Sequence, residues 1–125
     1  MITLSKEQIK RLHTMQLNAT GGLDGIRDEG LLDSALASAF QTFGGTELFP
    51  STAAKIARTA YGLVSNHPFV DGNKRIGTYV MLVLLELNNI NTDFSDDDII
   101  RIGLNLADGR MADGQLLDLI LERSK

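Results

Sequence analysis

Nine consecutive residues near the middle of the chain combine side chains that can act together on a phosphate group. They offer an imidazole, a carboxylate and two cations, at His67, Asp71, Lys74 and Arg75. An imidazole titrates close to neutral pH and can accept a proton from a hydroxyl group. Pro68 restricts its own backbone and disfavours helix at the residue before it, so the stretch is predicted to begin as a loop.

The two cations lie at an unusual end of a helix. Residues 76–88 are almost all apolar, which predicts a buried central helix with Lys74 and Arg75 in its first turn. The N-terminus of a helix already carries partial positive charge and free N–H groups, so cations there are unfavourable unless an anion binds between them. Phosphate commonly binds at such a position, and Gly72 lets the backbone approach it closely. The sequence therefore predicts a phosphate-binding loop with His67 above it.

The stretch from His67 to Arg75 resembles the signature of the Fic/Doc family, H-x-F-x-[D/E]-G-N-x-R, and every named position is present. Lysine before the arginine, as at Lys74, is typical of the death-on-curing (Doc) branch. The segments Gly21-Gly22-Leu23, Gly30-Leu31-Leu32 and Phe43-Gly44-Gly45 are also similar to Doc chains in content and order. The resemblance covers most of the chain. It implies an all-α, Fic/Doc-like bundle of about six helices around the central helix 76–88.

The resemblance also implies a role for each residue of the loop. His67 is expected to be the general base that takes a proton from a hydroxyl of a protein target. Asp71 is expected to hold Mg²⁺, which bridges phosphate oxygens of ATP. Phe69 is expected to point inward and anchor the loop. The remaining residues are expected to bind the phosphates: Gly72, Asn73, Lys74 and Arg75.

Two positions bear on which group is transferred. Fic adenylyltransferases usually have glycine where Lys74 stands and arginine where Thr78 stands. A lysine side chain fills room that the inner phosphates use, and loss of the arginine removes a two-point phosphate clamp. In the Doc branch this variation accompanies ATP bound in the reverse direction, so the resemblance implies a protein kinase. Two alternatives stay open: a Fic-type adenylyltransferase, and a catalytically silent module that binds a nucleotide or a partner.

The resemblance further implies the toxin of a type II toxin–antitoxin system. The inhibitory helix motif of Fic enzymes is absent, since Gly25 stands where that motif needs a hydroxyl residue before Glu29-Gly30. Control is therefore expected from a separate antitoxin protein, whose terminal segment folds into a groove on this domain. By resemblance the protein substrate is translation elongation factor Tu, and its modification would block translation.

Taken singly, the same residues also have ordinary structural interpretations. Asp71 is a candidate N-cap, and Lys74 with Arg75 can be solvated surface charges. His13 lies at the edge of an apolar helix face, where a structural role is favoured over a catalytic one. A P-loop is excluded, because Thr78 directly follows the second glycine where that motif needs a lysine first.

Length and composition restrict the number of domains, the kinds of partner and the chemistry that the chain can have. The 125 residues are expected to form one domain, 1–125, because this length buries most of the apolar surface in one core. The net charge of −4 argues against bulk attraction to nucleic acid. There is no cysteine, so disulfides and cysteine chemistry are excluded. No leader or membrane-spanning segment is recognised, so no membrane partner is expected and the cytoplasm is the expected location.

Apolar periodicity predicts the helices that position the loop. A capping box at Ser5–Gln8 begins the first, and Gly21-Gly22 ends it. Asp28 is expected to cap a second helix, whose apolar stripe runs from Leu31 to Phe43 and stops at Gly44-Gly45. A third helix, over 53–64, leads to His67, and two more follow the central helix, one after Ser95 and one over 116–121. Thr46–Pro50 is predicted to be an irregular link, and its position suggests a flap that aligns the target beside the loop.

Overall fold

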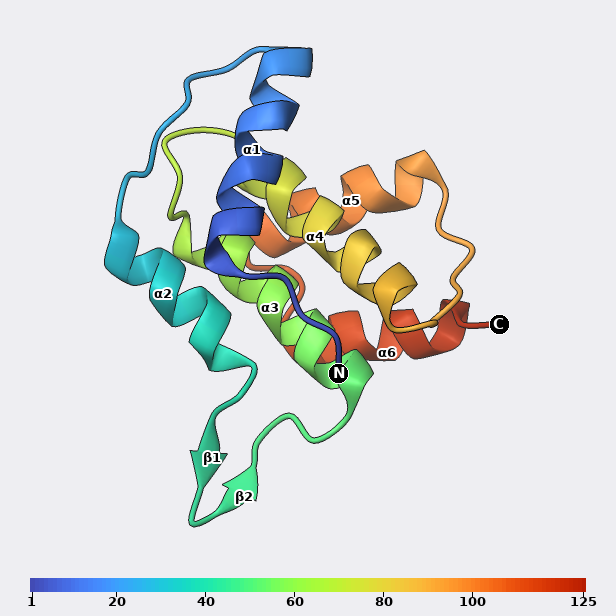
Figure 1. Cartoon of the computed structure of the whole chain (residues 1–125). Helices are drawn as coiled ribbons and strands as arrows, with labels where there is room; N and C mark the ends of the chain where they lie inside the picture. The colour runs from blue at the N-terminus through green and yellow to red at the C-terminus, as the bar shows by residue number, and fades with distance from the viewer.

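The computed structural model describes residues 1–125 and shows six helices with one short β-hairpin (Figure 1). The all-α fold predicted from the sequence is confirmed. In chain order the elements are α1 (Lys6–Thr20), α2 (Glu29–Ser38), β1 (Thr42–Phe43), β2 (Thr46–Glu47), α3 (Thr52–Asn66), α4 (Asn73–Leu87), α5 (Asp96–Ala107) and α6 (Asp113–Arg123). None of the six helices combines the length and apolar character that crossing a membrane requires.

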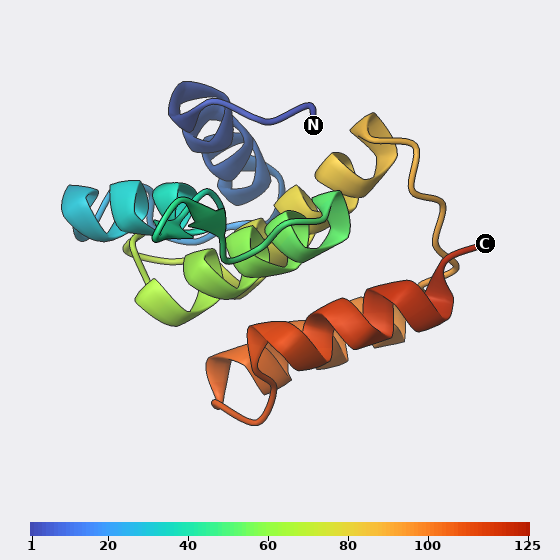
Figure 2. The same ribbon diagram turned by 90° about the horizontal axis from the view of Figure 1, so that it is seen from below.

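Helices α3 and α4 pack along each other at the centre of the bundle and are joined by the loop 67–72. Helix α3 also packs against α2, α5 and α6, while α4 packs against α5 and α1. In Figure 2, α5 and α6 lie on one side of the central pair and α1 with α2 on the other. The loop is therefore held at both ends by the two helices with the most extensive packing.

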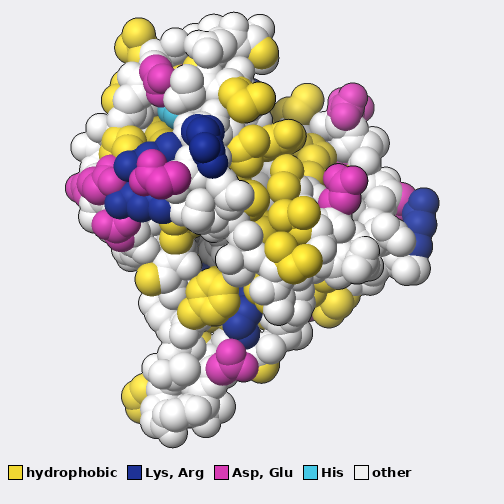
Figure 3. Space-filling view, viewed as in Figure 1, with side chains coloured by type: hydrophobic (Ala, Val, Ile, Leu, Met, Phe, Trp, Pro, Cys, Tyr) yellow, Lys and Arg dark blue, Asp and Glu magenta, His cyan; other side chains and the backbone are white.

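The predicted central helix 76–88 is present as α4, but it is not buried all round. Its inner face is fully buried at Ile76, Val80 and Met81. Tyr79 and Leu87 are 39% and 38% exposed, and the space-filling view shows a patch of hydrophobic side chains over α4 (Figure 3). The central position is thus shared with α3, whose buried side faces several helices.

The starts of α1, α2 and α5 follow the predicted caps, and α3 has a serine cap as well. Ser5, Asp28, Ser51 and Ser95 each accept a hydrogen bond from the backbone N–H three residues further on. Such side-chain acceptors satisfy donors that the first turn of a helix leaves without a partner. Lys6 and Lys10 of α1 pair with Glu29 of α2, and this charged cluster is visible in Figure 3.

The second helix is shorter than predicted. It ends at Ser38, and the residues expected to continue it to Phe43 turn instead into the β1–β2 hairpin. Gly44 and Gly45 form the turn with φ of 57° and 82°. Two successive positive φ values are typical of the type I′ turn, which a glycine pair favours, so turn chemistry overrides the helical spacing here. Phe43 is accordingly 80% exposed rather than buried.

The position of the hairpin argues against the predicted flap. Thr46–Pro50 lies at the N-terminal end of α3, whereas the loop 67–72 leaves its C-terminal end (Figure 1). At 1.5 Å per residue, this 15-residue helix separates the two by about 22 Å. The segment beside the loop is instead 22–28, where Ile26 forms an isolated β-bridge with Phe69.

Acid is expected to destabilise the start of α5. The carboxylate of Asp98 accepts hydrogen bonds from the Ser95 N–H at 2.9 Å and from Arg123 at 2.7 Å. The Ser95 N–H and the Arg123 guanidinium lower the pKa of Asp98 to about 2. Because this pKa is depressed in the folded state, the stabilisation is complete above the unfolded value near 4 and is lost as the pH falls towards 2.

Urea midpoints at pH 6 and pH 2.5 measure this contribution. Asp98→Asn should be less stable than the wild type at pH 6, and the difference should shrink at pH 2.5. Asp96→Asn removes a carboxylate from the same helical turn without touching Ser95 or Arg123, so it serves as the control. If the urea midpoints of Asp98→Asn and the wild type differ equally at both pH values, the Asp98 carboxylate is not the source of the pH-dependent stabilisation.

Candidate active site

Helix α3 ends at His67 in a left-handed backbone conformation, with φ of 52° and ψ of 52°. The sequence accounts for this stop, because Pro68 disfavours helical geometry at the residue before it. Few residues other than glycine adopt such a conformation. The His67 side chain is exposed and lines a cavity beside the loop.

Helix α4 begins without a capping side chain. Its N-cap is Gly72, with φ of 78° and no side-chain hydrogen bond. The predicted alternative that Asp71 is the N-cap is wrong, because its Oδ1 accepts only from the Gly72 N–H at 2.8 Å and its Oδ2 from the Leu23 N–H at 3.3 Å. The first N–H groups of α4 therefore have no side-chain acceptor, which favours an anion at this helix end.

The predicted site residues come together around one cavity of about 530 Å³. Its lining comprises Val64, His67, Asp71, Gly72, Asn73, Lys74, Arg75 and Ala107. The imidazole thus comes from the end of α3, the carboxylate from the loop and the two cations from the first turn of α4. This arrangement can bind an anion next to a base.

The cations at the cavity have no acidic partner. Neither Lys74 nor Arg75 forms an ion pair with any Asp or Glu, although acidic residues outnumber basic ones in the chain. The Arg75 guanidinium donates a hydrogen bond to the neutral Thr20 hydroxyl. Both positive charges therefore remain available to an anion.

Asn73 is buried, and its side chain holds the loop together. Its Oδ1 accepts from the Phe69 N–H and its Nδ2 donates to the Phe69 carbonyl oxygen, both at 3.0 Å. The amide thereby closes the turn that carries Asp71, while Phe69 itself points inward as predicted. Phosphate binding by Asn73 stays a prediction.

An apolar groove of about 250 Å³ continues from the cavity between α4 and α5. Lys74 and Arg75 line both hollows. The other residues of the groove are Thr78, Ile99, Ile100, Gly103 and Leu104. A ligand with an anionic end and a flat apolar end would fit the two hollows together.

The chain offers one carboxylate for a metal ion at this site. No group of three or more His, Cys, Asp or Glu side chains is placed to hold a metal. Asp71 is the only acidic residue that lines the cavity. A single carboxylate suits Mg²⁺, which usually keeps several waters and binds through one or two carboxylates together with substrate phosphates. The residues present therefore fit magnesium that arrives with a nucleotide.

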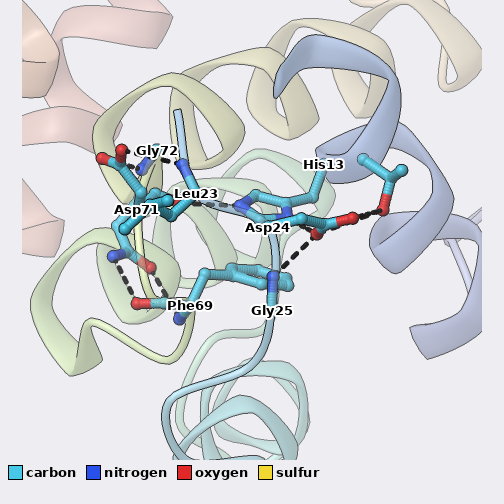
Figure 4. A network of polar contacts seen from close by, with 9 residues as sticks. His13, Leu23, Asp24, Gly25, Phe69, Asp71 and Gly72 are labelled. Carbon is cyan, nitrogen blue, oxygen red and sulfur yellow. Dashed lines mark hydrogen bonds and ion pairs between the residues drawn. The ribbon is translucent and has the colours of Figure 1, made fainter. Parts of the chain in front are cut away.

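Helix α1 supports the loop through a residue that sequence reasoning did not place at the site (Figure 4). His13 is 1% exposed, and its ring stacks on Phe69 with the centroids 3.8 Å apart. Its Nε2 lies 2.6 Å from the Asp71 carbonyl oxygen, and its Nδ1 lies 3.6 Å from Asp24 Oδ1. These contacts agree with the structural role favoured for His13.

The segment 22–28 supports the loop from the side, which the sequence did not reveal. Val70 donates its N–H to the Gly25 carbonyl oxygen, and Arg27 donates to carbonyl oxygens at the end of α3. At Gly22, with φ of 123°, an added Cβ atom would lie 2.9 Å from Asp71 Oδ2. Glycine is therefore required where this segment passes the carboxylate.

Comparisons with known proteins identify the family of this chain. A model of the Fic/DOC family matches residues 3–85. Toxin Doc of Mycolicibacterium smegmatis (strain ATCC 700084 / mc(2)155) is 37% identical over 81 residues, which cover 63% of this chain and 62% of that protein. Protein kinase doc of Escherichia phage P1 is 25% identical over 122 residues, which cover 94% of this chain and 91% of that protein. The first match thus spans less than two thirds of its relative's length, and the second spans most of it. The chain belongs to the Fic/DOC family.

Proposed function

We propose that this protein is a Doc-type toxin that transfers a phosphate group from ATP to a hydroxyl group of a protein target. The observation that carries the proposal is the single cavity shared by His67, Asp71 and the two cations Lys74 and Arg75. The names of the two relatives, a toxin and a protein kinase, support it.

In the proposed reaction the target hydroxyl oxygen attacks the γ-phosphorus of ATP. His67 takes the hydroxyl proton, a new P–O bond forms, and the bond from the γ-phosphorus to the bridging oxygen breaks so that ADP leaves. Asp71 would hold the Mg²⁺ ion, which supplies charge neutralisation to the phosphate oxygens. Lys74, Arg75 and the uncapped N–H groups of α4 would stabilise the negative charge on the transferred group.

Two side chains favour phosphoryl over adenylyl transfer. Lys74 lies where the cavity and the groove meet, at the position where adenylyltransferases of the family usually have glycine. The Thr78 hydroxyl donates to the carbonyl oxygens of Lys74 and Arg75, so it is turned back onto its own helix. Position 78 therefore adds no cation to the site, which supports a nucleotide bound with its terminal phosphate towards His67.

ATP labelled separately at the γ and α positions tests the proposal. The protein is incubated with Mg²⁺, each label in turn and a bacterial lysate as the source of target. We expect protein labelling from the γ position only. Labelling from the α position only would show that the protein transfers AMP, and the proposed phosphate transfer would be wrong. An increase in melting temperature with ATP and Mg²⁺, but no labelled product, would favour a silent nucleotide-binding module.

The nucleoside half of ATP is proposed to lie in the apolar groove between α4 and α5. Leu104→Glu would then remove apolar contact and place a carboxylate near the phosphates. Leu104 is 45% exposed, so this change should leave folding intact. We expect the KM for ATP to rise by roughly tenfold with a small change in kcat, since about 1.4 kcal/mol of lost binding corresponds to that factor. Leu121→Glu, on the exposed side of α6, is the matched control and should leave KM unchanged.

The proposed cellular role is growth arrest under the control of an antitoxin. Translation elongation factor Tu is proposed as the target, which places the reaction in the cytoplasm. A partner antitoxin would supply the control, as the name of the toxin relative suggests. Mass spectrometry of the labelled protein band identifies the target. If the labelled protein is not elongation factor Tu, the proposed phosphate transfer stands and the proposed substrate is wrong.

A further inference from the structure

We infer that Arg27 is a positioning residue, whose guanidinium fixes the backbone conformation of His67 and thereby aims the imidazole. This inference rests on the proposed function. Arg27 Nε donates to the His67 carbonyl oxygen at 2.7 Å, and its Nη2 donates to the Asn66 carbonyl oxygen at 3.0 Å. One planar group thus binds two successive peptide units, including that of the proposed base.

The end of α3 needs such a partner. The last carbonyl oxygens of a helix accept no hydrogen bond from within the helix, and they carry partial negative charge. Helix α3 has no basic residue in its last turn, so Arg27 supplies the cation from a different segment of the chain. Its backbone N–H also donates to the Pro68 carbonyl oxygen at 2.8 Å. Arg27 therefore contacts three consecutive carbonyl groups, at residues 66, 67 and 68.

The backbone conformation of His67 that Arg27 contacts is an uncommon one. Only His67 and Asn89 adopt positive φ among the residues other than glycine. Histidine and asparagine enter that region more often than most side chains do, but it remains the less populated one for both. Without a restraint, His67 would be free to return to a commoner backbone region. Such a change would redirect its side chain relative to Asp71 and the α4 N-terminus.

Arginine suits this position better than lysine does. A guanidinium presents several N–H donors in a rigid plane, so it can bind two adjacent carbonyl oxygens at fixed angles, whereas an ammonium group on a flexible stem acts as a single point charge. The Arg27 side chain has no other hydrogen-bond partner and no ion pair, and the residue is exposed. Its removal therefore leaves no cavity in the core.

The test compares Arg27→Ala and Arg27→Lys with Arg11→Ala, which removes an exposed arginine of α1 that makes no hydrogen bond or ion pair through its side chain. We expect Arg27→Ala to lower kcat by roughly 10- to 100-fold, because small misplacements of a reacting group have effects of that size. The KM for ATP should change by less than about threefold, since Lys74 and Arg75 are untouched. Arg27→Lys should recover part of kcat, and Arg11→Ala should match the wild type.

A second measurement does not depend on activity. The ¹³Cα and ¹³Cβ chemical shifts of His67 report its backbone region, and in Arg27→Ala we expect them to move away from left-handed values. Unchanged shifts would overturn the inference, as would unchanged kcat or a loss of activity matched by loss of folded protein. If the wild type transfers no label, the proposed function fails, and the shifts alone still decide what Arg27 does to His67.

Discussion

His67→Ala should reduce phosphate transfer by roughly 10²- to 10⁴-fold, which is the range that a positioned general base contributes. The cavity lining holds one imidazole, that of His67, and a positioned imidazole is the commonest general base in enzymes. Binding of ATP should persist, because Lys74, Arg75 and the α4 N-terminus are unaffected. Initial rates with γ-labelled ATP, together with the shift in melting temperature on adding ATP and Mg²⁺, measure the two effects separately.

Backbone strain is the main complication of this substitution, and a second variant controls for it. His67 has a left-handed backbone, which asparagine tolerates better than alanine. His67→Asn should therefore keep the loop geometry and still lose transfer, because an amide is not a useful base. Expression of the wild type should arrest growth, and both variants should relieve the arrest. Equal arrest by both variants would separate toxicity from the proposed chemistry.

The sequence predicted the parts of this site that are local in the chain. His67, Pro68 and the run from Asp71 to Arg75 lie within nine residues, so their spacing alone sets the order of loop, turn and helix start. The helix caps were predictable for the same reason, because a side chain and the N–H that it binds lie three residues apart. Local chemistry therefore accounts for the loop and most helix boundaries.

The supports of the loop could not be predicted, because they depend on tertiary contacts. His13 meets Asp71 across 58 positions of the chain, and Arg27 meets His67 across 40. Neither residue type indicates such a distant partner, because a histidine on a helix edge and an arginine in a turn have many ordinary roles. The hairpin was missed for a different reason, since the apolar spacing up to Phe43 outweighed the turn preference of Gly44-Gly45 in the interpretation.

The contact between α3 and α4 also depends on one glycine, and its replacement should destabilise the protein. A Cβ atom at Gly77 would lie 2.5 Å from Val64 Cγ2 and 3.3 Å from the Ala60 carbonyl oxygen. Both helices must then separate or Val64 must leave its preferred rotamer, which is restricted because the side chain is β-branched. Overpacking of this kind costs about 1–3 kcal/mol, and the helix propensity gained from alanine offsets up to about 1 kcal/mol of it. We expect Gly77→Ala to lower the free energy of unfolding by about 1–2 kcal/mol.

Urea denaturation of three further variants identifies the clash as the cause. Gly114→Ala, on α6, places a Cβ atom with no neighbour within 4 Å, so it should leave stability unchanged or raise it. Val64→Ala alone should destabilise by opening space in the core, but in the Gly77→Ala background its cost should fall, because the new methyl group fills that space. Additive effects of the two substitutions would refute the contact. Val64 also lines the cavity. The KM for ATP of the same double variant therefore shows whether the spacing of α3 and α4 affects nucleotide binding as well as stability.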